Sequence, residues 1–262
     1  MDIEQARQEI EAALETIMPS AEGPAATLHA AMRWAVAGGG KRVRPLVCMA
    51  AAEAVGGRPA DAMMPACAIE LLHSYTLVHD DLPPMDNDIE RRGRPSVWTK
   101  FGEAIAILAG DALQALAFET LARTPACHPG MWTRLLSALG AGAVGVVRGQ
   151  ATDIAGPDAT SGIDYIYAHK TADLFVAAAS MGAIAGGGTD GQVEQLAKFG
   201  RNLGLAFQHE DDLIDDDSPL GRDEAERRVR EHTAAAIDSL AGLPGDLEFL
   251  SWLANRLVTR VF

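Results

Sequence analysis

Two clusters of aspartates are the residues of this chain most able to do chemistry. Each cluster follows an apolar, helix-like run, and together they contribute Asp80, Asp81, Asp86, Asp211, Asp212 and Asp215. The helix dipole disfavours anions at the C-terminal end of a helix, so bound cations would have to offset that cost. Mg²⁺ prefers oxygen ligands and is usually held by one or two carboxylates together with substrate phosphates. The two clusters therefore predict a site for several Mg²⁺ ions and a diphosphate.

The spacing within each cluster supports a shared site. On a helix, Asp211 and Asp215 are one turn apart on the same face, where carboxylates about 4–6 Å apart repel each other unless a cation lies between them. In the first cluster Pro83–Pro84 interrupts the helix, and the bend can bring Asp86 back toward Asp80. The similarity between "LVHDDLPPMD" and "FQHEDDLIDDD" suggests that the two helix ends face each other across a cavity.

Basic residues are scarce, and several of them stand beside these clusters or beside glycine-rich turns. Lys and Arg together number 22 of the 262 residues, so their grouping is informative. The runs "GGGKRVRP", "ERRGRP" and "HKTADLF" supply Lys41, Arg42, Arg44, Arg91, Arg92, Arg94 and Lys170. A nucleotide P-loop needs Ser or Thr after the lysine and a strand before the loop. The run "AGGGKR" has an arginine there and follows a helical pattern, which excludes a P-loop.

Each single candidate also has a structural interpretation. His73, seven residues before Asp80 and two turns along the same helix face, could be a satisfied core histidine. Lys170 could be an ordinary helix lysine, and Gln208 could be a structural hydrogen-bonding residue. Asp111 lies inside an apolar helix, which suggests a supporting role behind the site.

The charge and cysteine content narrow the class of protein. The formal net charge is −14 and the pI is about 4.8, so the surface repels nucleic acid and anionic lipid. Cys48, Cys67 and Cys127 lie far apart in apolar surroundings, which predicts buried free thiols rather than disulfides or a metal site. The N-terminal segment is an acidic amphipathic helix rather than a signal peptide, and no run of eighteen or more apolar residues occurs. These features predict a cytoplasmic protein without stable membrane association.

Helical periodicity dominates the chain and predicts an all-α protein. Hydrophobic residues make up 48% of the chain, Ala and Leu are abundant, and β-branched and aromatic residues are sparse. Helices are predicted at 2–17, 24–37, 45–56, 60–81, 103–123, 130–150, 161–186, 190–215, 222–241 and 246–261. No linker is long enough to separate domains, so residues 1–262 are predicted to form a single domain.

Four motifs, taken in order, resemble those of a known family. The motifs "GGKRVRP", "LLHSYTLVHDDLPPMDNDIERRGRPS", "KTADLF" and "GLAFQHEDDLID" are similar to those of the trans-isoprenyl diphosphate synthases, the polyprenyl synthetase family. The longer DDxxxxD form of the first aspartate motif is most like the bacterial short-chain farnesyl diphosphate synthases. The resemblance implies an isoprenoid synthase fold, a bundle of about ten or more helices around a central cavity, usually in a homodimer. It implies head-to-tail condensation of isopentenyl diphosphate with an allylic diphosphate.

The resemblance also implies a role for each candidate. The six aspartates would hold Mg²⁺, about three ions per active site with Mn²⁺ able to substitute, and would stabilise the allylic diphosphate as it leaves. Arg91 and Lys170 would help to hold that diphosphate. The isopentenyl diphosphate would be bound without metal by Lys41, Arg44, His73 and Arg92. Thr171 and Gln208 would line the reacting carbons and stabilise the allylic cation.

The product length is expected to depend on Tyr75. This residue is five positions before Asp80, so it lies roughly 7.5 Å further along the helix. An aromatic residue there is the family pattern for a farnesyl (C15) product, because it would block elongation beneath the allylic site. Geranylgeranyl diphosphate (C20) is the nearest rival product. A class I terpene cyclase, a non-catalytic partner subunit and a Mg²⁺-dependent diphosphohydrolase are more remote alternatives.

One departure from the family pattern follows Asp215. Members of the family normally continue with a basic, glycine-rich loop whose lysines close over the diphosphates. Here "DDDSPLGRDEAERRV" runs almost directly into the next helix, and no lysine follows Lys198. Either the protein lacks the loop, or a mobile segment around Asp217 is missing from the sequence. The second explanation is preferred because the other motifs are intact.

Overall fold

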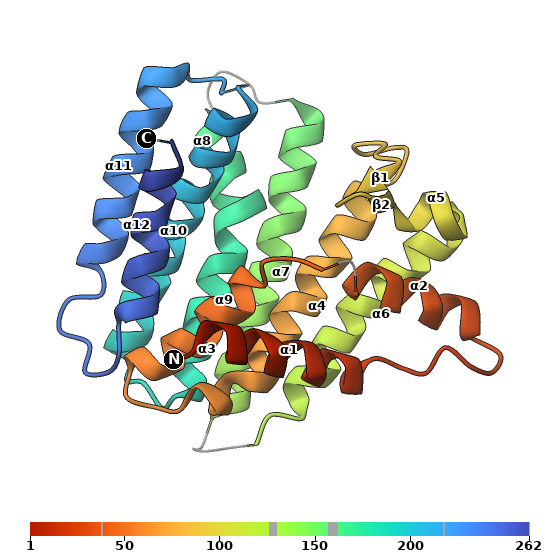
Figure 1. Cartoon of the computed structure of the whole chain (residues 1–262), viewed down its shortest axis with the longest axis horizontal. Helices are drawn as coiled ribbons and strands as arrows, with labels where there is room; N and C mark the ends of the chain where they lie inside the picture. Colours follow the sequence, from red (N-terminus) through yellow and green to blue (C-terminus); the bar gives the residue numbers. More distant parts are fainter. Residues whose placement is uncertain (38, 126–129, 157–161, 217, 262) are drawn as a thin grey trace.

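The structure is a computed structural model of the 262-residue chain. It describes residues 1–37, 39–125, 130–156, 162–216 and 218–261, with side chains as far as Arg256. Cys127 and Asp217 lie outside the described residues. Nearly all regular structure in the described ranges is helical, which confirms the predicted fold class (Figure 1).

The long helices stand side by side and a short hairpin lies at one end of the row. In chain order the elements are α1 (Ile3–Ile17), α2 (Ala26–Val36), α3 (Val43–Ala54), the 3₁₀ turn η1 (Pro59–Ala62), α4 (Met63–Asp80), β1 (Glu90–Arg91), β2 (Arg94–Pro95), α5 (Val97–Phe101), α6 (Glu103–Ala122), α7 (Met131–Ala155), α8 (Gly162–Ile166), the π-helical turn η2 (Tyr167–Ala172), α9 (Asp173–Ala185), α10 (Asp190–Asp215), α11 (Arg222–Asp238) and α12 (Glu248–Val261). In Figure 1, α11 and α12 lie on one side of α9, α7, α4 and α6, and the β1–β2 hairpin and α5 lie on the other.

Every predicted helix has a counterpart, and the differences have local causes. The single helix predicted over 161–186 is divided by the π-helical turn η2. The helix before this turn, α8, has only five residues, which is too short for a change in apolar periodicity to be recognised. The β1–β2 hairpin and α5 were not predicted. The hairpin turns at Arg92 (φ 55°) and Gly93 (φ 73°), and two successive residues with positive φ are what a tight two-residue hairpin requires.

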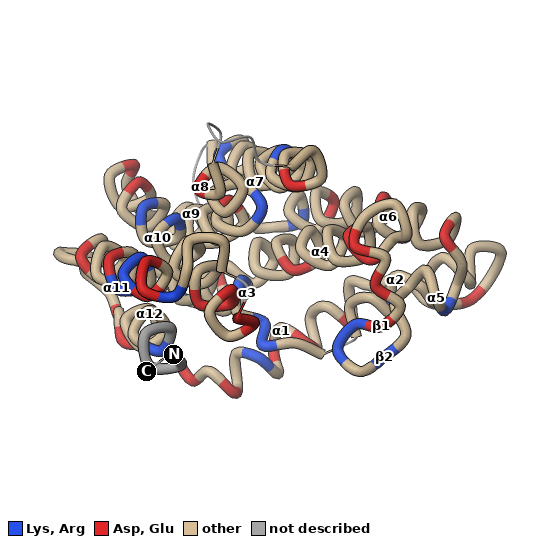
Figure 2. Tube along the Cα trace, turned by 90° about the horizontal axis from the view of Figure 1, so that it is seen from above, with Lys and Arg blue, Asp and Glu red and all other residues tan. Residues whose placement is uncertain are grey.

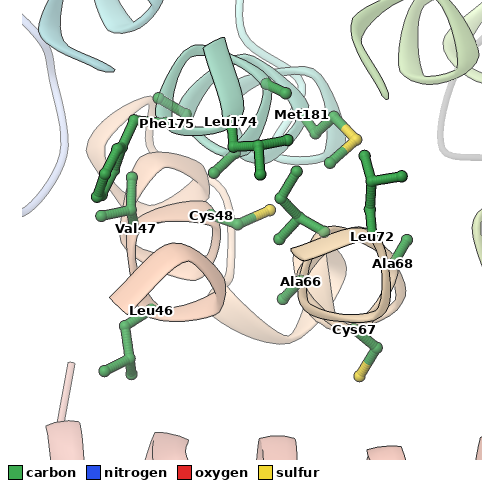
Figure 3. Close-up of a cluster of buried hydrophobic side chains, with 14 of the residues drawn as sticks. Leu46, Val47, Cys48, Ala66, Cys67, Ala68, Leu72, Leu174, Phe175 and Met181 are labelled. Carbon is green, nitrogen blue, oxygen red and sulfur yellow. The ribbon is translucent and has the colours of Figure 1, made fainter. Parts of the chain in front are cut away.

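The centre of the protein is formed by helices that are apolar on most of their surface. Leu174, Phe175 and Met181 of α9 are fully buried. Figure 3 shows them meeting side chains from α3 and α4, with Cys48 and Cys67 in the same region. Both thiols are buried and free, and burial raises the pKa of Cys67 to about 12. The prediction of buried free thiols is confirmed for these two cysteines.

The turn η2 lies in close contact with α7 on one side and α10 on the other. A Cβ at Gly149 of α7 would lie 2.2 Å from the backbone nitrogen of Lys170. A Cβ at Gly204 of α10 would lie 2.5 Å from the Cα of Ala172. Because any side chain would overlap the backbone at these positions, the two glycines allow η2 to be held directly between the helices.

One described helix, α6, is long and apolar enough by length and composition to cross a membrane, and 39% of its apolar stretch is buried. Core helices of soluble proteins can have the same length and composition, so this feature is weak evidence for a membrane span.

Replacing Gly149 with Ala is expected to lower the free energy of unfolding by about 1–3 kcal/mol, because the added methyl group would overlap the backbone of η2. Gly140→Ala is a matched control on the same helix, since nothing lies within 4 Å of its added Cβ. This control is expected to be neutral or to stabilise the protein by up to about 1 kcal/mol. Urea unfolding of both variants measures the difference, and equal midpoints would show that η2 does not pack tightly on α7.

Candidate active site

A cavity of about 570 Å³ is enclosed by α3, α4, α7, η2, α9 and α10. Its apolar wall includes Leu77, Val146, Leu174, Phe175 and Phe207. The predicted site residues that line it are Lys41, Arg44, His73, Asp80, Arg92, Lys170, Thr171 and Gln208. These residues come from all four sequence motifs, so the fold gathers the motifs around one cavity.

Helix α4 contributes one face to this cavity. His73, Thr76, Leu77 and Asp80 all line it, and their spacing of three, four and seven residues places them on the same side of a helix. The prediction that His73 and Asp80 share a face is therefore confirmed. Asp80 is the last residue of α4, so its carboxylate stands where the helix dipole disfavours an anion.

The negative charge of Asp80 is unfavourable in the surroundings that the structure gives it. Burial raises the pKa of Asp80 to about 6, and the charges of Asp86 and Asp81 act in the same direction. Lys170 and Arg91 oppose the shift without cancelling it. A cation beside Asp80 would offset both the burial and the repulsion between carboxylates, so the site favours a bound cation.

The loop after α4 returns Asp86 to the end of that helix. The backbone N–H of Met85 donates to the Leu82 carbonyl at 2.9 Å, and the N–H of Asp86 donates to the Asp80 carbonyl at 2.9 Å. The predicted bend at Pro83–Pro84 is confirmed, and it brings the backbone of Asp86 against that of Asp80.

Asp81 and Arg91 form an ion pair outside the lining of the cavity. Arg91 Nε donates to Asp81 Oδ1 at 2.5 Å, and only 3% of the Asp81 side chain is exposed. The same guanidinium reaches Asp88 at 3.3 Å. The pair fastens the β1–β2 hairpin to the end of α4, where Figure 2 shows basic and acidic residues close together.

Arg44 and His73 form a buried, positively charged corner of the cavity. Arg44 Nη1 donates to His73 Nε2 at 3.2 Å, and because a guanidinium can only donate, the proton of the neutral imidazole is on Nδ1. Burial lowers the pKa of Arg44 to about 10. Burial and then the charges of Arg44 and Arg92 lower the pKa of His73 well below 6.5, so its imidazole is neutral.

Two donors in this corner lack a hydrogen-bond partner among the described residues. They are Arg44 Nε and His73 Nδ1, and both atoms are buried. An unpaired buried donor is costly, so the pair indicates a place for a ligand acceptor. Lys41 and Arg92 line the same cavity, and Arg92 Nη1 donates to the Gly39 carbonyl. The corner therefore suits an anion bound without metal.

Arg42 belongs to the same basic run as Arg44, but its guanidinium is engaged in ion pairs. It reaches Glu70 at 2.5 Å and Glu11 at 2.6 Å, and 1% of the side chain is exposed. These contacts join the start of α3 to α1 and α4. The sequence motif did not separate the two arginines, because Glu11 is distant along the chain.

The second aspartate cluster is tied to η2 by side-chain hydrogen bonds. Thr171 Oγ1 donates to Gln208 Oε1 at 2.6 Å, and Gln208 Nε2 donates to Asp212 Oδ1 at 2.9 Å. The Tyr167 hydroxyl donates to Asp212 Oδ2. Lys170, in the same turn, donates from Nζ to Asp153 Oδ2 of α7 at 2.5 Å. The turn η2 is thereby bonded to both neighbouring helices.

The aspartates of α10 lie beside the cavity rather than in its lining. Asp211 acts by its charge on the buried Arg44, Asp212 is buried, and Asp215 is exposed at the end of the helix. Within the described ranges, no group of three or more His, Cys, Asp or Glu side chains could hold a metal ion by itself. The carboxylates suit Mg²⁺ when phosphate oxygens complete the coordination. The question of a lysine-bearing loop concerns Asp217, which lies outside the described residues.

Tyr75 is not among the residues that line the described cavity, although the adjacent Thr76 is. The Tyr75 ring is partly buried and lies edge-on to His79 at a centroid distance of 5.1 Å. Asp111, for which a supporting role was expected, is 62% exposed and lies 3.9 Å from His79 Nε2. Tyr75 and His79 lie on the side of α4 that faces α6, the helix that carries Asp111.

Three residues near the site were missed by the sequence analysis: Glu70, Asp153 and Tyr167. Glu70 and Asp153 are carboxylates within apolar helical stretches, which is the signal that drew attention to Asp111. Tyr167 is four residues before Thr171, a helical spacing that could have placed both on one face.

Comparisons with known proteins point to one family. Residues 25–222 match the family model described as polyprenyl synthetase. The chain is 40% identical over 267 residues to "Farnesyl diphosphate synthase" of Geobacillus stearothermophilus, covering 95% of this chain and 88% of that protein. It is 47% identical over 199 residues to "Heterodimeric geranylgeranyl pyrophosphate synthase large subunit 1, chloroplastic" of Arabidopsis thaliana, covering 72% of this chain and 54% of that protein.

Solved structures superpose on almost the whole chain. A crystal structure of an FPP/GFPP synthase from Zymomonas mobilis superposes with a TM-score of 0.91 at 36% identity, covering 98% of this chain and 97% of that one. A geranylgeranyl pyrophosphate synthetase from Pyrococcus horikoshii gives a TM-score of 0.88 at 29% identity, covering 98% and 96%.

The lengths of the relatives differ from that of this chain. It spans 54% of the Arabidopsis protein, about half of its length. The stretch aligned with the Geobacillus protein, 267 residues, is longer than the whole 262-residue chain, so that protein carries residues that this chain lacks. The family match nevertheless covers most of the sequence, and the chain belongs to the polyprenyl synthetase family.

Proposed function

We propose that the chain is a trans-prenyltransferase that joins isopentenyl diphosphate head-to-tail to an allylic diphosphate. The observation that carries this proposal is the presence of two opposite charge environments in one cavity. Asp80 favours a cation, whereas Arg44 and His73 favour an anion bound without metal. His73 and Asp80 are about 10 Å apart along α4, and apolar side chains line the space they share. The cavity can thus hold two diphosphates by different means.

The allylic diphosphate is assigned to the acidic end. The carboxylates that would hold Mg²⁺ are Asp80, Asp86, Asp211 and Asp215. Bound Mg²⁺ supplies positive charge that stabilises the diphosphate as a leaving group. Lys170 lines the cavity and its charge acts on Asp80, so its ammonium is placed to bind the same diphosphate. Arg91 contributes by holding Asp81 and the loop beside it.

The isopentenyl diphosphate is assigned to the basic corner. Arg44 Nε and His73 Nδ1 are donors without a partner among the described residues, and phosphate oxygens would satisfy both. Lys41 and Arg92 add positive charge to the same corner. Because His73 is neutral, it adds a donor without adding to the repulsion among these cations.

The reacting carbons would lie between the two diphosphates. Loss of the allylic diphosphate leaves a carbocation, which accepts the electron pair of the isopentenyl double bond to form the new C–C bond. The proton then lost from the adjacent carbon passes to the departed diphosphate. Leu174, Phe175 and Phe207 restrict the access of water, which would otherwise quench the cation. Thr171 and Gln208 are polar groups that line the same cavity.

We further propose a homodimer formed through the outer faces of α6 and α7. Large apolar side chains recur along α7 and are between 42% and 57% exposed: Trp132, Leu136, Val144, Val147 and Ile154. Ile107 and Leu108 of α6 are also exposed. Recurring exposed apolar side chains of this kind are typical of an interaction surface. On a second copy the same surface can pair with itself about a two-fold axis.

Purified protein incubated with geranyl diphosphate, labelled isopentenyl diphosphate and Mg²⁺ is expected to give a C15 alcohol after dephosphorylation. A C20 alcohol would support prenyl transfer and contradict the proposed length. Diphosphate release without a labelled product would contradict prenyl transfer and favour a cyclase or a diphosphohydrolase. Tyr75 lies beside the cavity rather than in its lining, so the Tyr75→Ala variant is expected to lengthen the product by opening space next to the cavity. An unchanged product would remove Tyr75 from this role.

His73 is expected to stay neutral when the pH falls through 6.5 in the free protein, because burial and the nearby arginines oppose a second proton. The measurement is NMR titration of histidine-labelled protein, with the resonance identified through His73→Gln. Inorganic diphosphate is expected to raise this pKa, since its negative charge favours the imidazolium. An inflection near pH 6.5 without ligand would contradict the buried, arginine-bonded geometry.

Val147→Glu is expected to shift the protein toward the monomer, because a charge would be buried in the paired surface. Sedimentation velocity measures the change. Ile89→Glu is the control, since Ile89 is 65% exposed but lies in the loop before β1. A variant at position 147 that remains as dimeric as wild type would show that α7 does not form the interface, and a monomeric wild type would contradict the dimer.

A further inference from the structure

The turn η2 and the end of α10 share a connected set of hydrogen bonds that the proposed reaction does not explain. Thr171 and Gln208 line the cavity, whereas Tyr167 and Asp212 do not. Gln208 accepts from Thr171 and donates to Asp212, and Tyr167 donates to the second oxygen of Asp212. A residue outside the cavity is thereby linked to a side chain inside it through one carboxylate.

These contacts determine which way the Gln208 amide faces. Its Oε1 accepts from the Thr171 hydroxyl at 2.6 Å, and its Nε2 donates to Asp212 Oδ1 at 2.9 Å. Rotating the amide by half a turn would place its oxygen against the Asp212 carboxylate, which has no proton to donate when it is ionised. Asp212 therefore selects one orientation of Gln208, provided that the carboxylate itself is held in place.

The hydrogen bond from the Tyr167 hydroxyl keeps the Asp212 carboxylate in place, and the packing of the Tyr167 ring fixes the position of that hydroxyl. The ring is 6% exposed and meets His209 edge-on at a centroid distance of 5.1 Å. His209 in turn stacks on His232 of α11 at 6.0 Å. A phenylalanine at position 167 would keep these ring contacts and would lack only the donor to Asp212.

We propose that Tyr167 is a positioning residue that acts through Asp212 to orient the Gln208 amide beside the reacting carbons. The inference rests on the proposed prenyl transfer and names a further residue of that site. It gives Asp212 a different role from the metal ligand implied by the family resemblance. Both oxygens of this carboxylate accept hydrogen bonds behind the cavity, and the Mg²⁺ ligands proposed above on α10 are Asp211 and Asp215.

The kinetic test compares Tyr167→Phe with wild type. The kcat is expected to fall about tenfold, the range of one charge-assisted hydrogen bond. The KM of each diphosphate and the Mg²⁺ concentration for half-maximal rate are expected to change less than about twofold, because neither Tyr167 nor Asp212 touches the cavity. Tyr165→Phe is the matched control, a tyrosine 38% exposed on α8, and it is expected to keep the wild-type kcat.

A double-mutant cycle with Asp212→Asn tests whether Tyr167 acts through Asp212. The kcat of the double variant is expected to be no lower than that of Asp212→Asn alone. Once the Asp212 carboxylate has been replaced, removing the hydroxyl that positions it has no further effect. Additive losses would overturn the proposal, as would wild-type kcat in Tyr167→Phe. A large rise in the Mg²⁺ requirement of Tyr167→Phe would also overturn it, since that result would place the hydroxyl in the metal site.

A measurement that needs no turnover separates this inference from the proposed function. The side-chain NH₂ resonances of Gln208, assigned in ¹⁵N-labelled protein through Gln208→Leu, report the hydrogen bond to Asp212 directly. Tyr167→Phe and Asp212→Asn are both expected to shift these resonances, and Tyr165→Phe is not. Unmoved resonances in Tyr167→Phe would overturn the inference, whereas an inactive wild type with shifted resonances would overturn only the proposed function.

Discussion

The burial of charge inside an apolar helical protein is the constraint on which the rest of the structure depends. A buried charge is tolerated only when a partner of opposite charge or several hydrogen bonds accompany it. Arg42 meets this requirement through Glu70, and these contacts join the start of α3 to α4. Asp80 and Arg44 do not meet it as fully, and both face the cavity. The fold therefore places these two incompletely compensated charges where ligands of opposite charge can enter.

The site also requires one short turn to supply side chains toward both α7 and α10. The π-helical turn η2 carries Lys170 toward α7 and Tyr167 and Thr171 toward α10. Gly149 and Gly204 make this possible, because side chains at those positions would overlap the backbone of η2. Backbone contact on two sides leaves the turn little room to shift, so the side chains that it supplies are held at fixed positions.

Much of the site could be predicted because its determinants are local. Pro83–Pro84 breaks α4 wherever the rest of the chain lies, so the return of Asp86 toward Asp80 followed from the sequence. The different roles of the basic residues could not be predicted from the sequence. Arg42 and Arg44 stand in the same motif and differ through tertiary partners such as Glu11. The widened turn η2 follows a helix of only five residues, which is too short to reveal a change in apolar periodicity.

Because the pKa of Asp80 is raised, its contribution to the stability of the folded protein depends on pH. Because the folded protein binds the proton more tightly than the unfolded chain, the contribution of Asp80 to stability falls as the pH rises from about 4 to about 6. Above that range the full cost of the buried carboxylate remains in the ligand-free protein. A cation bound there recovers it, and by the same argument an anion relieves the repulsion around Arg44. Binding of a cation at Asp80 or of an anion at Arg44 therefore stabilises the folded chain, because each ligand compensates a charge that folding alone leaves poorly compensated. The ligand-free protein is less stable as a result, and the same charges are what allow the site to bind its ligands.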